Sequence, residues 1–284
     1  MQVLIIGHKG MLGQELKKVF ETNGHEVTGC DREELDITDT EALKSKLDKL
    51  KPELVINATA INAVDKIEDT PEMYELAKNV NGLAVGQLAK LCKERKIILV
   101  HYSSDYVFKG DNDNGYPEDS PCDPVNKYGE TKALGEKLLQ ENTDQYYLIR
   151  LSKLFGKPAL SEGAKKSFVD TMISLVTEGG KTHLDVVDEE KSSPTYAPDL
   201  VNLTYRLVSQ KLPYGIYHGS NTGICTWYEW AKEVFNLKGI TVDITPVSGD
   251  KFPRPAKRPT SSELINTKLP GERSWQEALK EYLS

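Results

Sequence analysis

The first half of the chain alternates short apolar runs with longer segments in which apolar residues recur every three or four positions. A short apolar run between turn residues predicts a buried strand, and the longer period predicts a helix. The expected strands span residues 2–6, 25–29, 53–58, 97–102 and 147–151. Strands that alternate with helices in this way predict an α/β fold with a doubly wound parallel sheet.

Several residues indicate where helices begin and end. Thr70-Pro71 is typical of a helix start, and Gly24 is suited to end the first helix. Capping boxes, in which a Ser or Thr precedes a Glu by three positions, are predicted at Thr38/Glu41, Thr226/Glu229 and Ser274/Glu277.

The pattern loosens after Leu151. We expect a helix at 167–177, strands at 183–187 and 216–218, and irregular chain in the Pro-rich stretch 252–259. This change divides the chain into a dinucleotide-binding domain, residues 1–153, and a smaller, mainly substrate-binding lobe, residues 154–284. Parts of the second region are expected to return to the sheet.

Gly7, Gly10 and Gly13 form a GxxGxxG turn directly after the first expected strand and before the first helix. Glycines at this point let the backbone approach a pyrophosphate at the helix N-terminus and let the helix pack closely on the sheet. The turn therefore predicts a Rossmann-type unit that binds a dinucleotide. A glycine-rich turn without a ligand is the alternative, which the position in the first strand–helix unit disfavours.

Asp31 and Arg32 lie just beyond the second expected strand. A carboxylate at this position can accept hydrogen bonds from the adenosine ribose and favours NADH. An arginine can instead contact the 2′-phosphate of NADPH. The choice between NADPH and NADH stays open.

Tyr128 and Lys132 stand four residues apart in an expected helix and so share one face. A nearby ammonium favours phenolate, which would bring the pKa of Tyr128 closer to the range useful for exchanging a proton with a carbonyl oxygen. The same YxxxK spacing occurs twice more, at Tyr74/Lys78 and Tyr228/Lys232. Those two pairs are more typical of surface helices.

Ser104 distinguishes the Tyr128/Lys132 pair from the other two. It closes an expected parallel strand, and the carboxyl ends of such strands are where α/β sheets bind ligands. We therefore predict Ser104, Tyr128 and Lys132 as catalytic residues of a carbonyl reductase, with Ser104 bonded to the reacting oxygen. A strand-end hydroxyl that only caps backbone is the plainer alternative for Ser104.

Composition restricts the remaining classes of function. The net charge of −7 disfavours binding to nucleic acid, and no run of eighteen apolar residues predicts a membrane span. The four cysteines show no CxxC spacing and thus favour neither a zinc site nor a disulfide framework. We expect a cytoplasmic protein.

Further stretches narrow the interpretation, among them Ser104-Asp105-Tyr106-Val107-Phe108, Ser193-Pro194-Thr195-Tyr196 and Gly215-Ile216-Tyr217-His218. With the motifs above, they resemble dTDP-4-dehydrorhamnose reductases, a family of the extended short-chain dehydrogenase/reductase superfamily. The resemblance covers nearly the whole chain. It implies reduction of the 4-keto group of dTDP-4-dehydro-L-rhamnose to dTDP-L-rhamnose with NADPH or NADH, and it allows a homodimer.

The resemblance also implies roles for particular residues. Ser104 and Asp105 would contact the sugar, and Arg254 and Arg258 of a basic cluster would meet the nucleotide diphosphate, although a solvated basic loop is an equal alternative. Residues implied in binding the cofactor, beside the glycine turn and Tyr128 and Lys132, are Met11, Leu12, Asp31, Arg32, Asp36, Ile37, Ala58, Thr59 and Ala60.

Two departures from the family pattern affect the substrate. Lys153 replaces a substrate-contacting Trp, and Asn62 stands where Thr is usual. Another nucleotide-linked deoxysugar is therefore an alternative substrate. A related sugar-nucleotide epimerase or dehydratase is the main rival among enzymes, and a dehydratase is disfavoured because Asp105 is followed by Tyr106 rather than Glu.

Two further alternatives remain open from the resemblance. A noncatalytic regulatory subunit, similar to the β subunit of methionine adenosyltransferase, has the same fold. Some family members bind Mg²⁺ through acidic residues, and Glu15 and Glu190 could be placed similarly. Because distant glutamates are more often solvated, we predict no metal.

Overall fold

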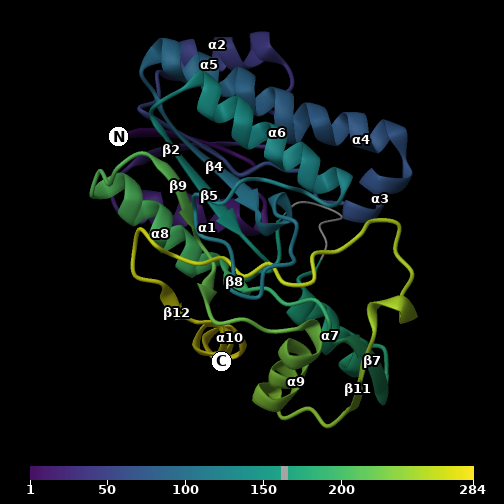
Figure 1. Ribbon diagram of the computed structural model, residues 1–284. Coiled ribbons are helices and arrows are strands. Elements are labelled where there is room, and N and C mark those ends of the chain that lie inside the picture. The colour runs from purple at the N-terminus through teal and green to yellow at the C-terminus, as the bar shows by residue number, and fades with distance from the viewer. Residues whose placement is uncertain (161–165) are drawn as a thin grey trace.

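The computed structural model describes residues 1–160 and 166–284, and a six-stranded parallel sheet forms its centre (Figure 1). In spatial order the strands are β2 (Glu26–Cys30), β1 (Gln2–Ile6), β3 (Leu54–Asn57), β4 (Ile98–Ser104), β5 (Tyr146–Leu151) and β9 (Gly215–His218). The predicted α/β fold with a doubly wound sheet is confirmed. The strand order reverses between β1 and β3, and a reversal of this kind opens a crevice at the carboxyl ends of the strands.

Helices cover both faces of the sheet. Val3 and Ile5 pack in one apolar layer with α1 (Met11–Thr22) and α8 (Ala197–Ser209), whereas Leu4 and Ile6 pack in the opposite layer. Because alternate residues enter different cores, strand β1 is apolar throughout rather than alternating. The opposite layer is formed by α2 (Thr40–Leu50), α5 (Ala84–Arg95) and α6 (Lys127–Asn142). Between β3 and α5 the chain forms α3 (Val64–Asp69), α4 (Pro71–Lys78) and the π-helical η1 (Asn79–Leu83).

The second lobe has an aromatic core of its own. Trp230 is fully buried and its ring stacks on that of Phe168, with centroids 5.0 Å apart. The helices here are α7 (Phe168–Thr177), α9 (Trp227–Lys238) and α10 (Trp275–Leu283). The paired strands are β7 (His183–Val187) with β11 (Asp243–Val247), β6 (Leu154–Phe155) with β8 (Thr195–Tyr196), and β10 (Asn221–Thr222) with β12 (Glu272–Ser274).

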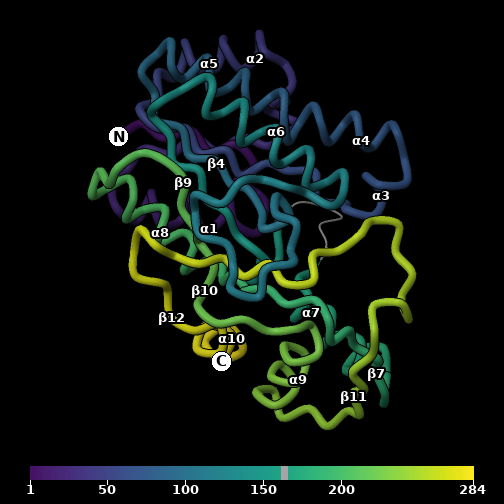
Figure 2. Tube along the Cα trace, viewed as in Figure 1, coloured from purple at the N-terminus to yellow at the C-terminus, as the bar shows by residue number. Residues whose placement is uncertain are grey.

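A C-terminal segment, residues 252–265, connects the two lobes. Figure 2 shows this yellow segment running back across the molecule from the side of β11 toward that of β12. Ser261 forms bridges to both Asp111 and Lys191, and Leu264 forms one to Tyr116. The segment therefore lies against the loop after β4, which contains Asp111 and Tyr116, and against the loop after β7, which contains Lys191.

Local signals predicted most element boundaries to within two residues. The capping boxes at Thr226 and Ser274 are confirmed. The one predicted at Thr38/Glu41 is wrong, because Thr38 donates its hydroxyl to Asp36 Oδ1 at 2.7 Å and is not available as a cap. Asp39 caps α2 instead, accepting from the backbone N–H of Ala42. Within the described ranges, no helix combines the length and apolar character that a membrane span needs.

Candidate active site

Two glycines of the turn between β1 and α1, Gly7 and Gly13, stand where a side chain is not tolerated. Gly7 has a φ of 87°, and its N–H donates to the carbonyl of Cys30 at 2.7 Å. A Cβ at Gly13 would lie 2.0 Å from the carbonyl oxygen of Gly7, well inside van der Waals contact. The absence of side chains brings the N-terminus of α1, which starts after Gly10, close to the strand ends.

A cavity of about 260 Å³ opens beside this turn, at the point where the strand order reverses. Its lining includes nine of the residues predicted to bind a cofactor: Gly7, Gly10, Asp31, Arg32, Asp36, Ile37, Ala58, Thr59 and Ala60. Met11, Leu12 and Gly13 form the first turn of α1 beside it. Sequence reasoning missed Leu35, Thr38, Ile61, Leu76 and Val80, which also line the cavity.

Asp31 and Arg32 point in different directions. One oxygen of Asp31 accepts the N–H of Lys9 at 2.9 Å and lies 3.2 Å from Nδ1 of His8, so this carboxylate is held against the glycine turn. The side chain of Arg32 is 76% exposed and its Nε lies 3.7 Å from Asp36 Oδ2. Hydrogen bonds from Thr38 hold the pKa of Asp36 below its usual value.

A second cavity, of about 320 Å³, lies at the carboxyl ends of β4 and β5 and holds Ser104 and Tyr128. Tyr128 stands in the first turn of α6, whose N-cap Asn126 accepts the N–H of Gly129 at 2.8 Å. A Cβ at Gly129 would lie 2.2 Å from the carbonyl oxygen of Tyr106, so this glycine allows α6 to approach the end of β4. The helix start thereby brings Tyr128 and Ser104 to one cavity.

Tyr128 and Lys132 are both strongly affected by burial. Burial raises the pKa of Tyr128 to about 12, although a hydrogen bond with Ser104 acts in the opposite direction. Burial also lowers the pKa of Lys132 to about 8, and its Nζ donates to the backbone carbonyl of Tyr102 at 2.7 Å. The expected lowering of the phenol pKa by Lys132 is not observed, because desolvation dominates and the ammonium contacts backbone.

Asp105 follows Ser104 at the start of the short helix η2 (Asp105–Val107) and lines the same cavity. Burial raises the pKa of this carboxyl group, while hydrogen bonds from three serine hydroxyls oppose the rise. Ser104 is one of these donors, at 3.1 Å. The carboxylate therefore orients the hydroxyl predicted to contact the reacting oxygen.

Lys153 lines this second cavity and contacts the opposite wall. Its Nζ donates to the backbone carbonyls of Glu190 and Cys225 at 3.2 and 3.1 Å, and it lies 4.2 Å from the ring centroid of Trp227. The position where the family resemblance implies a Trp thus carries Lys153, whose ammonium lies over the ring of Trp227. Burial lowers the pKa of Lys153.

The two arginines predicted to meet the diphosphate are paired within the protein. Arg254 forms an ion pair with Glu190, and Arg258 Nη2 lies 2.7 Å from Asp65 Oδ2. Glu190 also accepts the indole N–H of Trp227 at 2.9 Å, which places the Arg254 pair at the wall of the second cavity. The role of these arginines in binding substrate stays a prediction.

The remaining predicted groups lie elsewhere. Tyr74/Lys78 and Tyr228/Lys232 belong to α4 and α9, outside both cavities. Glu15 lies 4.0 Å from Lys157 Nζ. Within residues 1–160 and 166–284, no three His, Cys, Asp or Glu side chains form a group that could hold a metal ion.

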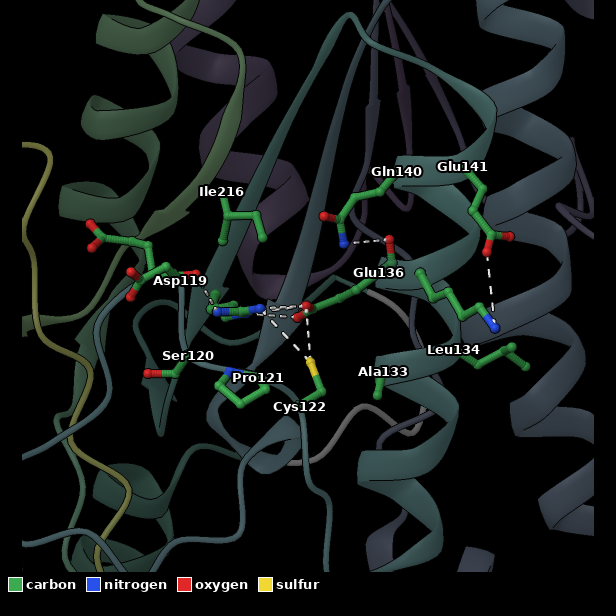
Figure 3. A pocket seen from close by; sticks show the side chains of 13 residues that line it. Asp119, Ser120, Pro121, Cys122, Ala133, Leu134, Glu136, Gln140, Glu141 and Ile216 are labelled. Carbon is green, nitrogen blue, oxygen red and sulfur yellow. Dashed lines mark hydrogen bonds and ion pairs between the residues drawn. The ribbon is translucent and has the colours of Figure 1, made fainter.

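A larger and more open cavity, of about 700 Å³, is lined by Glu136 and neighbouring residues of α6 (Figure 3). At its base Glu136 forms an ion pair with Arg150, Nη2 to Oε2 at 2.7 Å, with Cys122 beside both residues. None of the predicted site residues lines it. The size of a cavity is therefore not enough to identify the catalytic site in this protein.

Comparisons with known proteins agree with this geometry. The family described as RmlD substrate binding domain matches residues 1–284. The chain is 35% identical to the spore coat polysaccharide biosynthesis protein SpsK of Bacillus subtilis, over 99% of this chain and 96% of that protein. It is 36% identical to a dTDP-4-dehydrorhamnose reductase of Streptomyces griseus, over 98% of this chain and 91% of that protein.

A solved structure shows the same arrangement. The dTDP-4-dehydrorhamnose reductase of Bacillus anthracis, in complex with NADP, superposes with a TM-score of 0.92 at 32% identity, covering 99% of this chain and 98% of that one. The match extends over both lobes, as the resemblance in sequence predicted. The chain therefore belongs to the RmlD substrate binding domain family.

Proposed function

We propose that this protein reduces the 4-keto group of a nucleotide-linked deoxysugar with NADPH or NADH, converting dTDP-4-dehydro-L-rhamnose to dTDP-L-rhamnose. The observation that carries the proposal is the placement of two cavities at the carboxyl edge of one sheet. One adjoins the glycine turn, and the other holds Ser104 and Tyr128. Relatives that match nearly the whole chain are named for this reaction.

The first cavity fits a dinucleotide. Gly7 and Gly13 leave no room for side chains where a pyrophosphate would approach α1, and Asp31 and Ile37 line the region beyond β2. When bound, the nicotinamide supplies a hydride to the sugar carbonyl carbon. The chain's own residues then have to hold the sugar and provide a proton to the carbonyl oxygen.

Tyr128 is suited to provide that proton. With its pKa raised to about 12, the phenol is protonated at neutral pH and can act as an acid. Lys132 lies one helical turn further on, and its ammonium, charged below pH 8, donates to the carbonyl of Tyr102. Ser104 donates its O–H to Asp105 and accepts the N–H of Tyr106 at 3.2 Å, so its side chain is held in the same cavity as Tyr128.

The experiment is to mix the purified protein with NADPH and dTDP-4-dehydro-L-rhamnose and to follow loss of nicotinamide absorbance. Tyr128→Phe should abolish the oxidation while leaving NADPH binding intact. Tyr228→Phe is the matched control, since Tyr228 has the same YxxxK spacing but lies in α9. Equal activity of parent and Tyr128→Phe would contradict the proposed acid, whereas NADPH binding without any oxidation by the parent would favour a regulatory subunit.

Lys153 favours a second candidate substrate. Its ammonium lies within the sugar cavity, where the family usually has an indole, and it can donate a hydrogen bond that an indole ring face cannot. A reductase of another nucleotide-linked 4-keto sugar is the function this observation supports. Comparing kcat/KM for a panel of such sugars, each differing at one hydroxyl, separates the two candidates.

A further inference from the structure

Asp105 is a buried carboxylate held by hydroxyl groups. Its residue is 3% exposed, and Oδ1 accepts from Ser104 Oγ at 3.1 Å. Oδ2 accepts from Ser152 Oγ at 2.9 Å and from Ser262 Oγ at 2.7 Å. Buried carboxylates are expensive unless hydrogen-bonded, so these donors determine whether the group stays charged.

The three serines come from distant parts of the chain. Ser104 ends β4 and Ser152 follows β5, whereas Ser262 belongs to the C-terminal segment, 157 residues after Asp105. Ser262 is 2% exposed, and its backbone N–H donates to the carbonyl of Lys191 at 2.9 Å. Its position is therefore fixed by the chain on both sides of the cavity.

The surroundings of Asp105 make its charge sensitive to these bonds. The titratable groups that face it are Lys153 after β5, Tyr106 of η2 and Tyr128 of α6, with Glu190 and Arg258 acting on Tyr106. Burial raises the pKa of Asp105, and Ser262 comes first among the groups that lower it. If Asp105 took up a proton, it could donate to Ser104 and reverse the hydrogen bond between them.

We propose that Ser262 is a positioning residue for the reduction, a role that rests on the proposed function. By donating to Oδ2 of Asp105, it keeps the carboxylate an acceptor, so that the hydrogen bond from Ser104 to Oδ1 holds the Ser104 side chain in the cavity that also contains Tyr128. The C-terminal segment thereby acts on Ser104 through Asp105. Among residues 1–160 and 166–284, Ser152 is the only other residue whose side chain donates to Oδ2.

The test compares Ser262→Ala with Ser261→Ala. Ser261 is the matched control, because it is adjacent and buried but its hydroxyl is directed at the Asn112 carbonyl, 3.4 Å away. Titration of ¹³C-labelled aspartate, with the Asp105 signal identified by Asp105→Asn, should show the midpoint rising by roughly one pH unit in Ser262→Ala alone. With NADPH and the sugar, Ser262→Ala should lower kcat about tenfold and leave the KM for NADPH unchanged. Ser262→Thr, which keeps the hydroxyl, should retain most of the parent's kcat.

An unchanged Asp105 midpoint in Ser262→Ala, or a loss of kcat no greater than in Ser261→Ala, overturns the proposal. If Ser262→Ala does not fold, Ser262→Cys replaces the hydroxyl by a thiol, which is a weaker donor. An Asp105 titration midpoint equal to that of the parent would again contradict the proposal. Absence of sugar reduction by the parent refutes the proposed function and with it the role in reduction. The titration, which needs no turnover, then still decides whether Ser262 sets the charge of Asp105.

Discussion

Replacing Lys132 by Met should abolish reduction without weakening the fold. Lys132 is 2% exposed, and its pKa is lowered from 10.5 to about 8 by burial. That difference corresponds to roughly 3 kcal/mol by which burial of the charged form disfavours folding. Methionine has a similar shape and removes this term.

The substitution also removes a favourable contact. The hydrogen bond from Nζ to the Tyr102 carbonyl contributes about 1.5–3 kcal/mol, as is usual for a charged donor. Glu136 keeps its ion pair with Arg150, so no buried carboxylate is left without a partner. We therefore expect Lys132→Met at pH 7 to be as stable as the parent or up to about 2 kcal/mol more stable.

The pH dependence follows from the direction of the shift. Below pH 8 the lysine is charged in both states and its burial cost is fully present. Between pH 8 and 10.5 the folded protein releases the proton first, so the parent gains stability and the advantage of Lys132→Met disappears.

Urea unfolding at pH 7 and at pH 10 measures both effects, with Lys78→Met, an exposed lysine of the same YxxxK spacing, as control. A destabilisation of Lys132→Met beyond about 2 kcal/mol at pH 7 would refute the reasoning, because it would mean that the buried ammonium stabilises the fold.

Three further predictions concern binding and stability. Gly13→Ala should weaken NADPH binding at least tenfold in a fluorescence titration, because its Cβ would lie 2.0 Å from the Gly7 carbonyl oxygen; an unchanged Kd would argue against binding at this turn. Arg150→Met should lower the free energy of unfolding by about 3–5 kcal/mol in urea, since it leaves the buried Glu136 uncompensated; a change below 1 kcal/mol would contradict this. Lys153→Met should raise the KM for the sugar about tenfold and leave the affinity for NADPH unchanged, because Lys153 lines only the second cavity. Steady-state kinetics measure both, and a change in the KM for NADPH alone would contradict this prediction.

Much of the dinucleotide-binding half could be predicted from sequence because its signals are local. The glycine turn, the strand that precedes it and the helix that follows lie within 22 residues. Ser104 and Tyr128 could be placed together because a strand of a parallel sheet ends, and the helix that follows it begins, at the same edge of the sheet. Their order along the chain, rather than YxxxK spacing alone, distinguished Tyr128 from Tyr74 and Tyr228.

Other features depend on contacts that no local pattern contains. The bond from Ser262 to Asp105 joins residues 157 positions apart, and nothing around Ser262 marks it as part of a site. The phenol pKa was expected in the wrong direction, since spacing shows that Lys132 shares a helix face with Tyr128 but not how deeply both are buried. Leu35 was detectable in principle, because it directly precedes Asp36 and Ile37, which were predicted to bind the cofactor.

The ion pair between Glu136 and Arg150 has a consequence for how the acid is kept in place. Tyr128, Lys132 and Glu136 follow one another at intervals of four residues, so they lie in a row along one side of α6. Arg150 lies on β5, and besides Glu136 it donates to the Glu118 carbonyl at 3.1 Å. A shift of α6 by one turn would separate these charges inside the protein, so the helix has a single permitted position along its axis. The first turn of α6, which carries Tyr128, is thereby held at the carboxyl ends of β4 and β5.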